Sequence, residues 1–149
     1  MIHAKTWVLG LGSIVAVLLA ACGGGETTGT DESPRTIEVQ TLDEFRFEPS
    51  EVTVEAGETI RFVVSNSGEL EHEFVLGPEH VQMAHEEASK MGGEHGEMHV
   101  EGQLAALELQ PGETKEATVT FEEGGEILMG CHVQGHYDAG MVGQVVIET

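Results

Sequence analysis

The chain has few basic residues, few cysteines and few aromatic residues. Among its 149 residues, 27 are Asp or Glu and only 6 are Lys or Arg, which gives a formal net charge of -21. Phosphate backbones repel so negative a chain, so the composition excludes a nucleic-acid partner. Two cysteines exclude a disulfide-rich scaffold. The length and a hydrophobic content of 40% predict a single domain with appendages.

Long hydrophobic runs are also missing. The apolar stretch at residues 7–21 is shorter than the about 20 residues that a membrane-spanning helix needs. Because it follows Lys5 closely, it is typical of the apolar region of a secretory signal peptide. An uncleaved N-terminal anchor is the alternative.

The residues at the end of this stretch favour the signal peptide. Leu19-Ala20-Ala21-Cys22 resembles the lipobox of bacterial lipoproteins. The resemblance implies cleavage before Cys22, whose thiol would carry a lipid anchor. We therefore expect a signal peptide at 1–21, a flexible tether at 22–35 and a domain at 36–149. The exported protein would be anchored to the bacterial membrane and would face the periplasm or the cell exterior.

Short alternating apolar runs, separated by turn residues, fill the chain from Thr36 onward. Regular spacing of this kind predicts an all-β sandwich or barrel of about eight strands. The runs lie at residues 36–40, 45–47, 52–54, 60–64, 72–76, 104–109, 117–121, 126–131 and 142–147.

Residues 79–100 lack this alternation and form a long insertion rich in His and Met. Apolar residues recur there at intervals of three or four, at Val81, Ala84, Ala88 and Met91, which predicts a short amphipathic helix. Imidazole and thioether groups are metal ligands, so the insertion is a candidate second metal site. The alternative is a solvated acidic loop that binds nothing. The candidate ligands are His80, Met83, His85, Met91, His95, Met98 and His99.

Cys131, His136 and Met141 follow one another at equal intervals before the last run, and His72 opens an earlier one. This pattern resembles the cupredoxins, the blue-copper proteins of the plastocyanin and azurin type. The resemblance implies a Greek-key β-sandwich with one type 1 copper, bound by these four side chains. Its trigonal Cys and His ligands and its weak axial Met suit both oxidation states of copper. Ligation would also protect Cys131, which has no evident disulfide partner.

Other copper centres do not fit the sequence. In multicopper oxidases the residue after the cysteine, here His132, binds a trinuclear cluster that also needs a histidine at the position of Gly130 and His-x-His pairs elsewhere. The chain has neither. A binuclear centre needs two loop cysteines, and there is one. We therefore expect His132 to be exposed or hydrogen-bonded. We also expect no enzymatic activity, because a fully ligated copper has no open position.

The leading hypothesis for function is a monomeric, membrane-tethered one-electron carrier. The family resemblance implies His136 as the electron port, and the expected partner is a redox protein such as a c-type cytochrome or an oxidase. The negative charge would steer a basic partner, although solubility or adaptation to high salt explains it equally well. The alternative is a copper-handling protein for buffering, trafficking or tolerance, favoured by the His/Met-rich insertion.

Overall fold

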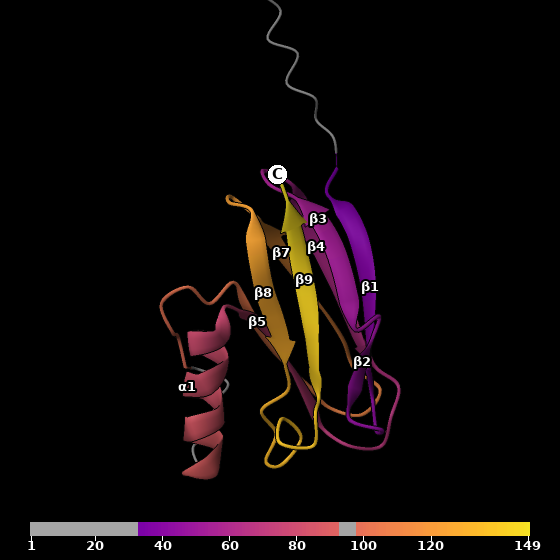
Figure 1. The fold of residues 1–149 in the computed structure, drawn as a ribbon. Coiled ribbons are helices and arrows are strands. Elements are labelled where there is room, and N and C mark those ends of the chain that lie inside the picture. Colours follow the sequence, from indigo (N-terminus) through magenta and orange to yellow (C-terminus); the bar gives the residue numbers. More distant parts are fainter. Residues whose placement is uncertain (1–32, 93–97) are drawn as a thin grey trace, which may run out of the picture. The chain divides into compact units, whose positions relative to one another are not determined.

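The computed structural model describes residues 33–92 and 98–149 (Figure 1). Within these ranges the chain forms nine strands and one helix. The all-β prediction is confirmed. The number of strands exceeds the expected eight, because the runs around Phe47 and Val52 form separate short strands in different sheets. In the described part of the chain, no helix is both long enough and apolar enough to span a bilayer.

The first sheet has four strands in the order β2-β1-β4-β7. Strands β1 and β4 are parallel, whereas β2 and β7 pair antiparallel with their neighbours. The strands are β1 (Arg35–Leu42), β2 (Arg46–Glu48), β4 (Thr59–Asn66) and β7 (Thr114–Thr120).

The second sheet has five strands in the order β3-β9-β8-β5-β6. Strand β3 is parallel to β9, and the remaining pairs are antiparallel. The strands are β3 (Glu51–Glu55), β5 (His72–Gly77), β6 (Ala105–Leu109), β8 (Gly125–Gly130) and β9 (Val142–Glu148).

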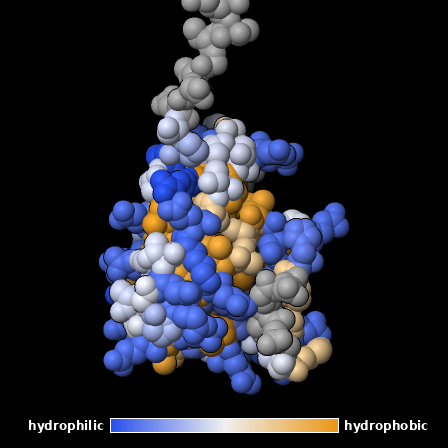
Figure 2. Space-filling view, turned by 180° about the vertical axis from the view of Figure 1, so that it is seen from behind, coloured by the Kyte–Doolittle hydropathy of each residue, from blue (hydrophilic) through white to orange (hydrophobic). Residues whose placement is uncertain are grey.

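Apolar side chains from both sheets form one core. Along β4, Ile60, Phe62 and Val64 are buried, and the residues between them face outward, as the period of a half-buried strand requires. The ring of Phe74 in the second sheet lies 5.6 Å from that of Phe62 and 6.0 Å from that of Phe47, centroid to centroid. Hydrophilic side chains cover much of the surface seen in Figure 2, and hydrophobic ones show between them.

Strand β5 is buried at every position because both of its faces are covered. Helix α1 (Glu79–Lys90) follows it and packs against β5 and β8, at the side of the sandwich (Figure 1). The predicted helix is therefore confirmed, but its predicted apolar face is wrong. Of that face only Val81 is fully buried, and Met91 is 75% exposed. The side chains that α1 buries are mostly polar: Gln82, His85, Glu86 and Ser89.

Candidate metal centre

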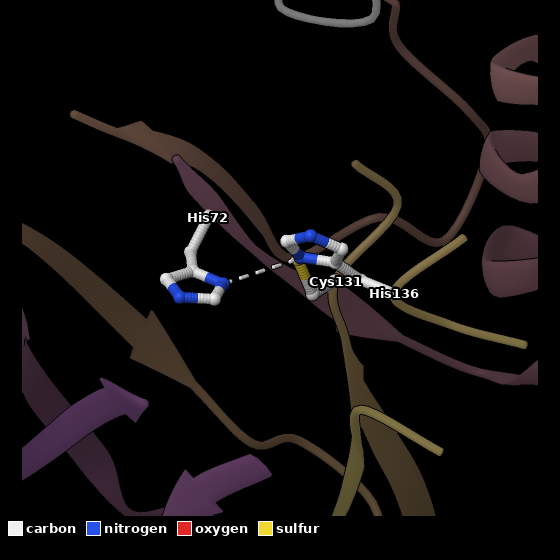
Figure 3. Close-up of side chains that lie close together, drawn as sticks. All are labelled: His72, Cys131 and His136. Atoms are coloured by element: carbon white, nitrogen blue, oxygen red, sulfur yellow. Dashed lines mark hydrogen bonds between the residues drawn. The ribbon is translucent and has the colours of Figure 1, made fainter. Parts of the chain in front are cut away.

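Three predicted ligands meet at one end of the sandwich. His72 opens β5, and Cys131 directly follows β8, which pairs antiparallel with β5. The Sγ atom of Cys131 lies 3.9 Å from Nδ1 of His72 and 3.4 Å from Nδ1 of His136. All three side chains are buried, and their ligand atoms lie within 4.8 Å of one another. Figure 3 shows them turned toward a common point.

The loop between β8 and β9 is closed by main-chain hydrogen bonds that link its ligands. The amide of Cys131 donates to the carbonyl of Met141 at 3.2 Å, and the amide of Met141 donates to the carbonyl of His136 at 3.0 Å. Gly135 and Gly140 have φ values of 88° and 98°, which favour glycine and allow the tight turns. Met141, the predicted axial ligand, is fully buried beside these residues.

The chemistry of these donors fits a single copper ion. Burial raises the pKa of the Cys131 thiol to about 12, so the thiol keeps its proton unless a cation replaces it. Burial, together with the neighbouring His72, lowers the pKa of His136 and favours the neutral imidazole that a metal requires. One thiolate and two imidazoles suit Cu(I) and Cu(II) alike, and the bound copper supplies one-electron redox chemistry.

Asp43 supports the site from outside, in the turn between β1 and β2. Its carboxylate accepts hydrogen bonds from the amides of Glu69 at 2.8 Å and Leu70 at 3.2 Å, and these bonds lower its pKa. Nε2 of His72 lies 3.2 Å from its Oδ1. Because a carboxylate only accepts, it keeps the His72 proton on Nε2 and leaves the Nδ1 lone pair directed at the metal position.

The same turn contacts the second histidine. Phe45 has a φ of 58°, which is uncommon for a residue other than glycine. Its ring centroid lies 4.7 Å from that of His136. Sequence reasoning found neither Asp43 nor Phe45 as part of the site, because the turn precedes His72 by many residues and carries no ligand-type motif.

His132 is buried rather than exposed, so the second of its two predicted states is the correct one. Its Nε2 donates to Oε1 of Gln82 at 2.9 Å, and its Nδ1 lies 3.2 Å from Oε2 of Glu86. A side chain at Gly130 would collide with Gln82 and His132. The histidine that a trinuclear cluster needs at that position therefore has no room.

Two histidines of the predicted second metal site, His80 and His85, have separate hydrogen-bond partners. His80 is exposed, and its Nε2 lies 2.8 Å from the carbonyl oxygen of Glu101. His85 is buried on the inner side of α1, where its Nε2 lies 2.8 Å from Oε1 of Gln103. Among the described residues, the one group of three or more His, Cys, Asp or Glu side chains close enough to share an ion is the type 1 set.

The methionines of helix α1 and its C-terminal end lie at the surface. Met83 and Met91 are 64% and 75% exposed. At a rise of 1.5 Å per helical residue, positions 83 and 91 lie about 12 Å apart along the helix axis. Met98 and His99 lie in the coil that follows, and His95 lies outside the described residues. A site that includes His95 stays a prediction.

Buried Cys and His ligands at the end of a two-sheet β-sandwich define the class of blue-copper domains. The family described as copper binding proteins, plastocyanin/azurin family, matches residues 35–148. The chain belongs to this family, and copper is its cofactor.

Relatives and solved structures agree with this assignment. The copper-resistant cuproprotein CopI of Rubrivivax gelatinosus is 38% identical over 116 residues, which cover 78% of this chain and 68% of the relative. The protein of the same name from Pseudomonas aeruginosa is 34% identical over 149 residues, which cover 83% of this chain and 82% of the relative. The solved structure of auracyanin A, a blue copper protein from Chloroflexus aurantiacus, is 27% identical with a TM-score of 0.68 and covers 78% of this chain and 100% of that one. The predicted cupredoxin-like fold is confirmed.

The contact between Asp43 and His72 generates a prediction. Asp43→Asn replaces the carboxylate that orients His72, so we expect copper affinity to fall about tenfold or more, measured by competition with a chelator. Gly68→Ala should act in the same direction, because its new Cβ would collide with the Asp43 carboxylate. Glu44→Gln removes one charge from the same turn and is the control. An Asp43→Asn protein with the affinity of this control would contradict the role.

Proposed function

We propose that the protein acts in copper resistance and that its working group is one type 1 copper, held by His72, Cys131, His136 and Met141. The observation that carries the proposal is the buried, converging set of Cys and His side chains in a chain whose relatives at 34% and 38% identity are copper-resistant cuproproteins. The protein has no catalytic role in this proposal, because the four ligands occupy the copper and leave no position for a substrate.

Replacing the cysteine ligand tests this proposal. Wild-type protein should bind one equivalent of copper with an intense visible band, and Cys131→Ser should lose the band because the thiolate is gone. In a strain that lacks the gene, wild type should restore growth on copper and Cys131→Ser should not. Met83→Leu removes an exposed soft ligand from α1 and is the control. Full copper tolerance with Cys131→Ser would overturn the proposal.

A one-electron carrier is the second candidate, and the closed geometry of the site favours it. The strand pairing and the hydrogen bonds of the ligand loop hold these side chains in place, so a change of oxidation state would require little movement of the protein. His136, 8% exposed and next to Phe45, is the proposed point of electron exchange with a redox partner. Likeness to auracyanin A, a blue copper protein, supports this candidate.

Electron exchange distinguishes the second candidate from the first. The formal charge of -21 should attract a basic partner, so reduction by a c-type cytochrome should be fast and should slow as salt is added. Stopped-flow absorbance at several ionic strengths measures this. If exchange were slow at every ionic strength and the deletion strain were copper-sensitive, the carrier role would be rejected and the resistance role retained.

We propose further that the protein is an exported, monomeric lipoprotein, held at the membrane through Cys22, which lies outside the described residues. The support is the lipobox-like sequence before this cysteine. Cys22→Ser should move the protein from the membrane fraction to the soluble fraction, since a lipid anchor would be lost. Cell fractionation with mass spectrometry of the N-terminal peptide measures this. A variant that stays with the membrane would show that the lipid is not the anchor.

A further inference from the structure

Helix α1 buries its polar side against the chain segment that carries the cysteine ligand. Buried polar groups are costly unless they are hydrogen-bonded. Two of them, Gln82 and Glu86, lie one helical turn apart and both reach His132, the residue after Cys131. The burial of these side chains therefore links the insertion to the metal centre.

Gln82 is the first half of this link. Its Nε2 donates toward the carbonyl oxygens of Val75 and Gly77 at 3.2 Å each and of Leu128 at 3.1 Å. These three acceptors, which belong to β5 and β8, fix the orientation of the amide. Its Oε1 is then directed at His132 and accepts the Nε2 hydrogen at 2.9 Å.

His132 is held from several sides. In addition to Gln82, Oε2 of Glu86 lies 3.2 Å from its Nδ1. Its ring stacks on Tyr137, with centroids 4.7 Å apart and planes 22° apart. The His132 ring also stacks with the ring of His85, with centroids 5.5 Å apart and planes 30° apart. The imidazole therefore has little freedom to rotate or shift.

The main chain carries this restraint to the ligand. The amide of His132 donates to Oε2 of Glu73 at 3.2 Å, and the amide of Glu73 donates to Sγ of Cys131 at 3.2 Å. Glu73 in turn directly follows His72, which is the proposed copper ligand on β5. A displacement of His132 would thus move the sulfur of Cys131 and the amide that stabilises it.

We propose that helix α1 is a positioning element of the copper site: Gln82 and Glu86 hold the imidazole of His132 and thereby fix the main chain that carries Cys131. The inference rests on the proposed copper site. It assigns the helical part of the insertion to the support of the copper ligands. His132 and the two helix residues are positioning residues that do not touch the metal.

Two substitutions in α1 and a matched control test the proposal in the full chain. Gln82→Met keeps the size of the side chain and removes its amide. Glu86→Gln removes the buried carboxylate, and Glu87→Gln makes the same chemical change at the neighbouring exposed position. Thermal unfolding of each metal-free protein establishes that the variants fold.

The first measurement uses the copper-loaded protein. Gln82→Met and Glu86→Gln should shift the visible band and release copper to a chelator about tenfold faster than Glu87→Gln, because outer-shell contacts tune affinity by about that factor or more. A helix that only stabilised the fold would change the unfolding temperature and leave the band in place. Folded variants with the band and release rate of Glu87→Gln would overturn the proposal.

The second measurement needs no copper. Hydrogen exchange followed by NMR in the metal-free protein should show faster exchange of the His132 and Glu73 amides in Gln82→Met and Glu86→Gln than in Glu87→Gln. Unchanged exchange would refute the positioning role even if wild-type protein bound no copper. Absence of a visible band in wild type, with faster exchange in the two variants, would reject the copper function and retain the positioning role.

Discussion

The structure depends on one constraint, a buried thiol between two imidazoles that come from different parts of the chain. Burial raises the pKa of this thiol to about 12, so the thiolate that copper requires forms at neutral pH only when a cation replaces the proton. His72 and His136 turn their Nδ1 atoms toward the same sulfur. The antiparallel pairing of β5 with β8 and the closed loop before β9 both keep this arrangement in place.

Two segments outside the ligand loop restrain the site from opposite directions. The turn between β1 and β2 contacts both histidines, His72 through Asp43 and His136 through Phe45. Helix α1 reaches the residue after the cysteine. The β-sandwich holds the strand ends, whereas these two segments define the orientation of the side chains, on which the properties of a metal centre depend.

The sequence predicted best what is local in the chain. The spacing of Cys131, His136 and Met141 indicates a ligand set because these residues belong to one loop. The roles of Asp43 and Phe45 could not be predicted from the sequence, since they depend on a turn that approaches the site only in the folded chain. The prediction of an apolar face on α1 was wrong for a related reason. Periodicity assumes that the helix packs on apolar side chains, but α1 packs on strand carbonyls and His132. Gln82 and Glu86 are therefore buried instead.

The placement of the His and Met residues bears on how copper resistance could operate. His85 packs on His132 at the inner side of α1, and Met83 points into solvent on the other side. Among the described residues, the sandwich holds the one group of three or more His, Cys, Asp or Glu side chains close enough to share an ion. If the type 1 site alone acts in tolerance, one ion per chain is a small capacity for buffering, because bound copper cannot then exceed the amount of protein. If the protein supports copper tolerance, the relevant property is then the redox state or transfer of that one ion, which joins the resistance role to the chemistry of an electron carrier.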